Sequence, residues 1–78
     1  MKTTRYFDAI RSRPDRAPIR EEWITQTIEH PEHQRTQADG RIQLWARIDD
    51  ADSLWLRVVL LADGETVHNA FFDLGFEP

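Results

Sequence analysis

Residues 41–61 have the sequence RIQLWARIDDADSLWLRVVLL, in which apolar side chains recur at every second position. Two series of this kind flank a short acidic turn: Ile42, Leu44, Ala46 and Ile48 before it, and Leu54, Leu56, Val58 and Leu60 after it. A period of two is typical of a β-strand that buries one face and leaves the other outside the core. The stretch therefore predicts two antiparallel strands joined by a hairpin turn.

The same Trp-x-Arg triplet occurs in both predicted strands, as Trp45-Ala46-Arg47 and Trp55-Leu56-Arg57. A turn of odd length between the strands matches apolar with apolar positions, and it then places Trp45 opposite Arg57 and Arg47 opposite Trp55. Such exposed neighbours gain about 0.5–1 kcal/mol each by cation–π attraction. The outer face of the sheet is therefore either a binding surface or a surface that stabilises the sheet alone.

The rest of the chain predicts two helices and two further strands. Tyr6, Phe7 and Ile10 form one helical stripe that Pro14 ends, and Pro31 ends a second amphipathic segment. The predicted helices span about 4–13 and 20–30, and the predicted strands about 33–38, 41–49, 53–62 and 65–72. The expected fold class is α+β: a single domain with two N-terminal helices packed on one face of a four-stranded antiparallel β-meander, whose outer face is uncovered.

The dipeptides Asp39-Gly40 and Asp63-Gly64 favour tight type I′ turns of two residues. For the last two strands, a two-residue loop predicts the pairs Leu60 with Val67, Val58 with Asn69 and Leu56 with Phe71. It also places His68 opposite Val59 and Phe72 opposite Trp55, on the outer face. Asn69 is then expected on the buried face, where its amide requires a partner.

The composition is that of one small soluble domain. The chain has 78 residues, of which 40% are hydrophobic and 31% charged, and it has no cysteine. Disulfides and thiolate metal sites are thus excluded, and a reducing cytoplasm is the natural compartment. No apolar run reaches the length of a membrane span, and the stretch 1–13 lacks the apolar core of a signal peptide. We expect a cytoplasmic protein without membrane contact.

Charge is distributed unevenly along the chain. Residues 1–20 carry six basic and two acidic side chains, a net charge of +4, whereas residues 21–78 carry four basic and twelve acidic ones, a net charge of −8. Binding of a polyanion would thus be confined to the basic N-terminal segment and the Arg-bearing sheet face. Attraction between the two halves of the fold explains the distribution equally well.

Two polar clusters invite a metal-binding interpretation, but neither is favoured. His30-Pro31-Glu32-His33 has two histidines three residues apart, yet Pro31 breaks the helix that would place them on one side of a metal ion. Asp49, Asp50 and Asp52 lack the glycine and the distal glutamate of a calcium loop. We therefore expect neither a metal nor a cofactor.

Four segments resemble a family of small bacterial proteins of unknown function, many of them cyanobacterial, that is similar to the RelE/ParE-like toxin fold. The segments are IREEW (19–23), HPEH (30–33), LRVV (56–59) and GETVHNAFFD (64–73), and the resemblance extends over about residues 6–76. It implies a relationship to ribonucleases or gyrase poisons that are paired with an antitoxin and have their active site on the open sheet face. The chain departs from that pattern in its pI of about 5.2 and in having no Lys or Arg after Arg57.

One hypothesis is an endoribonuclease that acts on the outer face. Cleavage of RNA requires a base for the 2′-hydroxyl proton, a cation beside the phosphorane and a surface on which a base stacks. His68 is the candidate base, Arg47 and Arg57 are the candidate cations, and Trp45 and Trp55 would stack the base.

The second hypothesis, which the acidic balance favours, is a non-catalytic interaction module. Trp, Tyr and Arg are enriched where protein interfaces concentrate their binding energy. The candidate binding residues are Trp45, Arg47, Trp55, Arg57 and Phe72. The expected partner is another protein or a second copy of the chain, with RNA as the alternative.

Overall fold

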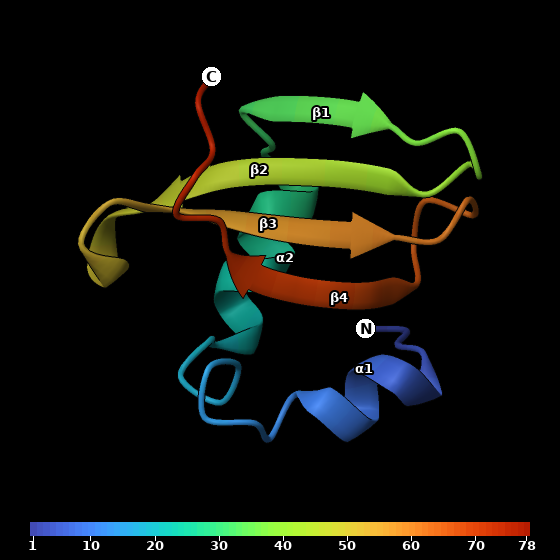
Figure 1. The fold of residues 1–78 in the computed structure, drawn as a ribbon, viewed down its shortest axis with the longest axis horizontal. Helices are drawn as coiled ribbons and strands as arrows, with labels where there is room; N and C mark the ends of the chain where they lie inside the picture. Colours follow the sequence, from blue (N-terminus) through green and yellow to red (C-terminus); the bar gives the residue numbers. More distant parts are fainter.

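The computed structural model describes all residues from 1 to 78 and confirms the α+β class with a four-stranded antiparallel sheet (Figure 1). The helices are α1 (Arg5–Ile10) and α2 (Glu21–Glu29), and the strands are β1 (His33–Thr36), β2 (Ile42–Ile48), β3 (Leu54–Leu60) and β4 (Val67–Phe72). Every element lies within the range expected for it. The strands follow one another across the sheet in chain order, which is the topology of a meander.

The β2–β3 hairpin has the predicted register. Trp45 pairs with Arg57 and Arg47 pairs with Trp55, while Leu44 pairs with Val58 on the opposite face. The connecting loop has the expected odd length, because Ile48 pairs with Leu54 and leaves residues 49–53 between them. A 3₁₀ turn (Asp49–Ala51) begins this loop, and Asp52 and Ser53 complete it with φ values of 55° and 56°.

The β3–β4 register differs from the prediction because β4 contains a bulge. Leu60 pairs with Val67 as expected, but Val59 pairs with Asn69, so that His68 is an extra residue on β4. One extra residue moves every later side chain to the opposite face. The predicted pairs of Val58 with Asn69 and of Leu56 with Phe71 are therefore wrong, and so are the positions predicted for His68 and Phe72. Leu56 pairs with Phe72 instead, which turns Phe72 to the inner face.

The N-terminal segment accounts for the bulge. The backbone N–H of Val67 donates to the carbonyl of Lys2 at 2.9 Å, and the carbonyl of Val67 accepts from the N–H of Thr4 at 3.0 Å. These two bonds form a parallel bridge between Thr3 and Val67 along the free edge of β4. Val67 is thus fixed from outside the sheet, and the ladder with β3 resumes only after His68.

Both predicted two-residue turns are wrong, because each loop is longer. At the first, Gln37 N–H donates to Arg41 O, which leaves three residues in the loop. At the second, Leu61 N–H donates to Thr66 O, which leaves four residues. Gly40 and Gly64 have φ values of +89° and +73°, so the glycines supply the left-handed conformation in longer loops than the tight ones they favour.

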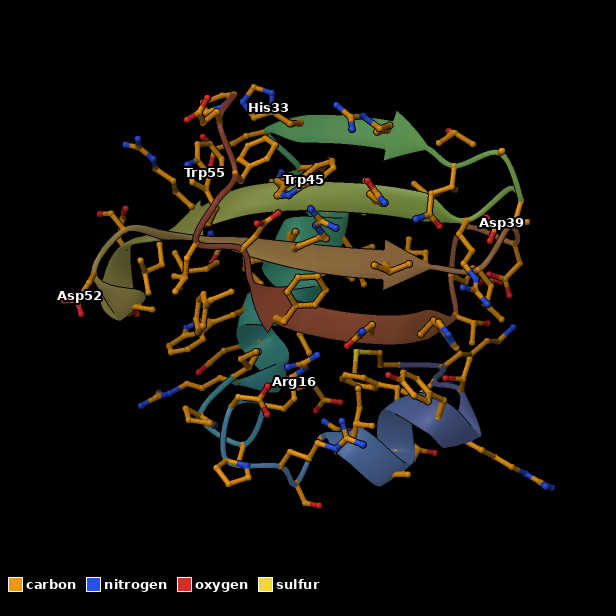
Figure 2. All side chains as sticks on the ribbon, viewed as in Figure 1. Arg16, His33, Asp39, Trp45, Asp52 and Trp55 are labelled. Carbon is orange, nitrogen blue, oxygen red and sulfur yellow. The ribbon has the colours of Figure 1, made fainter.

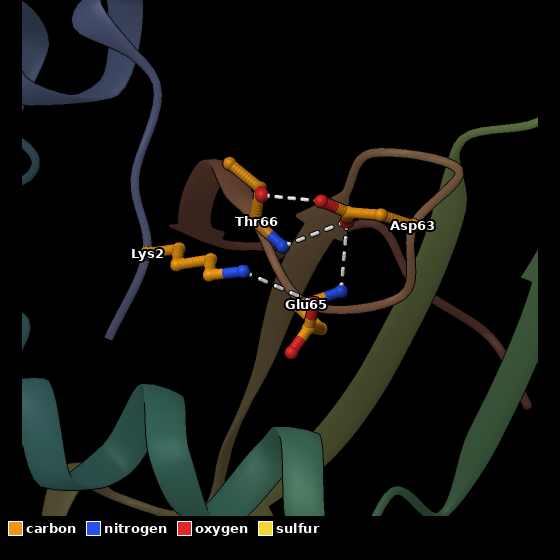
Figure 3. A network of polar contacts seen from close by, with 4 residues as sticks. All are labelled: Lys2, Asp63, Glu65 and Thr66. Atoms are coloured by element: carbon orange, nitrogen blue, oxygen red, sulfur yellow. Dashed lines mark hydrogen bonds and ion pairs between the residues drawn. The ribbon is translucent and has the colours of Figure 1, made fainter.

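Asp63 organises the β3–β4 loop (Figure 3). Its carboxylate accepts hydrogen bonds from the backbone N–H groups of Glu65 and Thr66, both at 2.9 Å, and from the hydroxyl of Thr66 at 2.5 Å. The hydroxyl and these backbone donors lower the pKa of Asp63 from 3.8 to about 2. Beside this network, Lys2 forms an exposed ion pair with Glu65 at 3.4 Å.

We expect Asp63→Asn to reduce the acid sensitivity of the fold. Because the pKa of Asp63 is lower in the folded chain, its stabilising contribution is complete above pH 3.8 and is lost as the pH falls toward 2. Thermal unfolding midpoints measured between pH 5 and pH 2 should therefore fall less steeply in the variant. Asp52→Asn, at an exposed carboxylate in the β2–β3 loop, is the matched control. If the unfolding midpoints of Asp63→Asn and the control fall equally steeply with pH, the role assigned to Asp63 in the β3–β4 loop is wrong.

The two helices pack at different places. The N-cap hydroxyl of Thr4 accepts a hydrogen bond from Phe7 N–H at 3.1 Å, and α1 lies along β4. Glu21 and Glu22 in the first turn of α2 complement the helix dipole. This second helix packs across β2 and β3, behind the sheet in Figure 1, whereas α1 is drawn beyond the β4 edge. Neither helix is long and apolar enough to cross a membrane.

One hydrophobic core joins the helices to the sheet. It consists of Phe7, Ile10, Ile24, Leu44, Ile48, Leu56, Val58, Leu60, Val67 and Ala70. Phe72 packs at the margin of this core, with its ring 6.2 Å from that of Trp23. The core is therefore built on the inner face of β2, β3 and β4.

Candidate functional site

The two Trp-x-Arg triplets lie side by side on the outer face of the sheet. The guanidinium of Arg57 lies 5.0 Å from the ring centroid of Trp45, and that of Arg47 lies 5.1 Å from Trp55. Figure 2 shows Trp45 and Trp55 on the same side of the sheet, with His33 beside them. The sequence therefore identified these four neighbours correctly.

This face is not uncovered as predicted, because the C-terminal segment 73–78 folds back across it. The Asp73 N–H donates to the carbonyl of Trp55 at 2.8 Å, which continues the strand ladder past the end of β4. Phe76 then stacks on Trp45, with the ring centroids 4.6 Å apart and the planes at 15°. As a result Trp45 is only 2% exposed. Trp45 is thus a packed residue and not part of an open surface.

Asp73 is the polar centre of the covered region. One carboxylate oxygen, Oδ2, accepts from the indole Nε1 of Trp45 at 3.0 Å and from Arg57 Nε and Nη2 at 2.9 and 2.5 Å. Burial alone would raise the pKa of Asp73, but the hydrogen bonds from Trp45 and Arg57 lower it below its ordinary value. The Asp73 side chain is 14% exposed and that of Arg57 is 28% exposed, so solvent screens this ion pair only in part. Arg57 is therefore neutralised within the chain.

A partly exposed cluster remains at the edge of the covered region. The ring of Phe76 meets those of Trp55 and His33 edge-on, at centroid distances of 5.1 and 5.4 Å. Trp55 and Phe76 are half-buried, whereas His33 and Arg47 are exposed. We name this group, Trp55, His33, Phe76 and Arg47, the aromatic rim.

A row of alternating cations and aromatic rings crosses the sheet beside the rim. It runs in the order Arg35, Trp45, Arg57, Phe71 and Arg16, with guanidinium-to-centroid distances of 6.0, 5.0, 5.1 and 5.2 Å between successive members. Phe71 is on the outer face opposite Arg57, whereas the predicted register placed Phe72 on that face, opposite Trp55. Arg16 reaches this row from the loop between the helices, as Figure 2 shows.

The predicted catalytic residues are not brought together. His68 lies in the bulge, where Nδ1 is 3.1 Å from the hydroxyl of Thr4 and the ring stacks on Tyr6 at 4.9 Å. Arg47 pairs with Trp55, which lies four residues before Val59, the β3 residue next to the bulge. At about 3.3 Å per residue, that separation is more than 10 Å. Burial and the nearby charge of Arg41 lower the pKa of His68, which keeps the imidazole neutral near pH 7.

Asn69 also differs from its predicted position. It pairs with Val59 on the outer face, and its Oδ1 accepts from Ala70 N–H at 2.9 Å and from Arg16 Nε at 3.4 Å. The side-chain amide of Asn69 therefore binds the backbone of β4 and the guanidinium of Arg16. The cause is the same bulge that reverses Phe71 and Phe72.

The site residues that the sequence did not identify are Asp73, Phe76, Phe71, Arg35 and Arg16. For Asp73 and Phe76, the only signal in the sequence was the presence of an acidic and an aromatic residue shortly after the last predicted strand.

Comparison with known proteins yields no family model, no curated protein and no solved structure that matches this chain. No group of three or more His, Asp or Glu side chains lies close enough together to hold a metal ion.

Proposed function

We propose that this chain is a non-catalytic interaction module that docks an acidic, aromatic-bearing segment of a protein partner at the aromatic rim. The observation that supports this most directly is the C-terminal segment itself. It places a carboxylate on Arg57 and a phenyl ring on Trp45, which supports a partner with the same chemical groups. In this proposal α2 occupies the inner side of the sheet, and the aromatic rim is the part of the outer side that is left for binding.

The charges at and beside the rim support an acidic partner. Arg47 in the rim and Arg35 in the neighbouring row are exposed, and neither forms an ion pair within the chain. The guanidinium of Arg47 lies against the ring of Trp55, which holds it in place for a carboxylate. Pre-positioned Arg and Trp side chains lose little conformational freedom on binding, which is characteristic of interface residues that contribute most of the affinity.

The alternative, a RelE/ParE-like ribonuclease, has weaker support. The candidate base His68 contacts Thr4 and Tyr6, and the candidate cation Arg57 is already bound to Asp73. Neither candidate cation, Arg47 or Arg57, would therefore be free beside this base to stabilise a phosphorane. Measuring RNA cleavage by the chain and by His68→Ala tests this alternative directly, and cleavage that His68→Ala abolishes would establish it.

The docking proposal is tested with a synthetic peptide that has the sequence of residues 73–78, DLGFEP, added to the full chain. We expect the indole N–H resonance of Trp55 to shift on titration, because the peptide supplies carboxylates for Arg47 and a ring for the rim. Trp23, which lies on α2, is an internal control and should not shift. Arg47→Glu, which retains the Trp55 reporter, should weaken binding at least about tenfold, as loss of a charge-assisted contact predicts.

Arg13→Glu is the matched charge control, because Arg13 is exposed and forms no ion pair. Equal weakening by Arg13→Glu and Arg47→Glu would mean that the peptide responds only to overall charge, and the rim assignment would be wrong. Sedimentation of the unliganded chain separates the case in which the partner is a second copy. In that case the concentration-dependent dimer should disappear in the double variant Trp55→Ala, Arg47→Glu.

A further inference from the structure

The two edges of the sheet differ in what covers them. On the β4 side, the N–H of Val67 donates to the carbonyl of Lys2 at 2.9 Å, and its carbonyl accepts from the N–H of Thr4 at 3.0 Å. β1 forms the opposite edge, and all four of its residues, His33–Thr36, are exposed. Figure 1 shows β1 as the outermost strand, with no segment of the chain paired along its outer side. The β1 edge is therefore the side on which another strand can extend this sheet.

The backbone groups that point outward from this edge belong to Gln34 and Thr36. Gln37 N–H donates to Arg41 O at 2.8 Å, and in this antiparallel ladder every second residue bonds to the neighbouring strand. The odd-numbered residues of β1 therefore bond to β2, and the N–H and C=O groups of Gln34 and Thr36 point away from it. No other segment of the chain donates to these groups or accepts from them. An extended segment can bind all of them at once.

Arg35 lies between these two residues, on the outer face of the sheet. Its side chain is exposed and forms no ion pair. The acidic residues at either end of β1 have other contacts: Glu32 accepts from the backbone N–H of Arg47 at 2.7 Å, and Asp39 pairs with Arg41 at 3.7 Å. The middle of the edge therefore carries a positive charge without a partner.

This charge distinguishes a second copy of the chain from a different partner. Two copies of β1 related by a two-fold axis can use all their outward backbone groups in one antiparallel alignment, in which Gln34 of each copy pairs with Thr36 of the other. That alignment places Arg35 directly opposite Arg35 of the other copy, with Cα atoms about 4.5 Å apart. Like charges at opposed positions destabilise a strand pair, whereas opposite charges stabilise it. The edge therefore disfavours a second copy and favours a strand with a carboxylate at that position.

We propose that an acidic, extended segment of the partner adds to the β1 edge as an antiparallel strand, with a carboxylate side chain opposite Arg35. The inference rests on the proposed docking function, because the strand is assigned to the same partner. An antiparallel strand that passes Arg35 leaves the edge at His33, whose ring centroid lies 5.4 Å from that of Trp55 in the aromatic rim. The partner's acidic strand therefore precedes, in its sequence, the aromatic residue that reaches the rim.

The test is a titration of the isotope-labelled full chain with the peptide acetyl-ETVEVTE-amide. Its central glutamate lies opposite Arg35 when its two valines pair with Gln34 and Thr36. We expect the backbone N–H resonances of Gln34 and Thr36 to shift, and their hydrogens to exchange more slowly with solvent. Val67, whose N–H already bonds to Lys2, is the internal control and should be unchanged.

Backbone methylation of the peptide tests the strand pairing without altering the protein. N-methylation of both valines should weaken binding at least about tenfold, because it removes the two donors that face β1. N-methylation of both threonines is the matched control, because their N–H groups face away from β1, and it should leave the affinity unchanged.

A charge exchange tests the position of the carboxylate. Arg35→Glu should weaken binding of the peptide at least about fivefold, and a peptide with lysine in place of the central glutamate should restore it. Arg13→Glu, at an exposed residue without an ion pair, is the control for overall charge and should have a smaller effect.

The outcomes separate the edge from the rim. Unchanged resonances of Gln34 and Thr36, equal effects of the two methylated peptides, or equal weakening by Arg35→Glu and Arg13→Glu would each overturn the edge assignment. The peptide has no aromatic residue, so its binding reports on the edge alone. If DLGFEP leaves the Trp55 indole unshifted while this peptide still protects Gln34 and Thr36, docking at the rim is wrong and the strand site stands.

Discussion

Replacing Trp45 by alanine is expected to lower the free energy of unfolding by about 3–5 kcal/mol, the usual cost of removing a buried aromatic side chain. Trp45 is 2% exposed, stacks on Phe76 at 4.6 Å and donates its indole N–H to Asp73. The substitution removes all three interactions and leaves a space beneath the C-terminal segment. Urea unfolding followed by circular dichroism measures the loss directly.

Trp55→Ala is the matched control for this experiment. Trp55 occupies the equivalent position in the second triplet but is only half-buried. We expect it to cost about 1–2 kcal/mol, within the ordinary range for a partly exposed position. Equal losses in the two variants would show that the C-terminal segment does not cover Trp45 in solution. Because Trp45→Ala is destabilising, it is unsuitable as a probe of binding, and the rim must be tested at Trp55 and Arg47.

The sheet could be predicted from the sequence wherever alternation and loop parity acted together. Between β2 and β3, a register shifted by one residue would place Trp45 and Arg47 in the core and Leu44 in solvent. Only one pairing satisfies both strands. The positions of the two Trp-x-Arg triplets follow from that constraint alone.

The β4 register could not be predicted in the same way. Phe71 and Phe72 are adjacent aromatic residues, so the inner face receives a phenyl ring in either register. The choice depends on hydrogen bonds between Val67 and the N-terminal segment more than sixty residues away in sequence. Alternation within a strand contains no information on such a partner, and the bulge at His68 therefore escaped prediction.

The sequence did not predict that the outer face is covered, because the segment that covers it, residues 73–78, is irregular. Residues 73–78 have neither the period of a strand nor that of a helix, so periodicity does not place them. Their position follows from separate interactions: the Asp73 carboxylate meets two donors, and Phe76 meets the Trp45 ring. Each partner was visible in the sequence, but the path of the chain between them was not.

Asp73→Ala is expected to destabilise the chain by about 2–3 kcal/mol at pH 7, because it leaves the Trp45 indole and the Arg57 guanidinium without their shared acceptor. Asp73→Asn keeps an oxygen of similar shape without the charge and should cost less. The difference between the two variants measures the contribution of the acceptor itself. Chemical unfolding at pH 7 provides both values, and a cost below that of exposed Asp52→Ala would contradict the assigned role of Asp73.

The pH dependence of Asp73→Asn separates the charge from the packing. The folded chain lowers the pKa of Asp73, so its carboxylate stabilises the fold fully above about pH 4 and progressively less as the pH falls below that value. The asparagine variant should therefore approach the unsubstituted chain in stability as the pH falls below about 4. The pKa of Asp63 is also lowered in the folded chain, so the comparison is made in the Asp63→Asn background. Acrylamide quenching of Trp45 in a Trp23→Phe, Trp55→Phe chain then distinguishes local release of the C-terminal segment from global unfolding. If Asp73 anchors the segment, quenching should rise on protonation while the circular dichroism of the sheet is still unchanged.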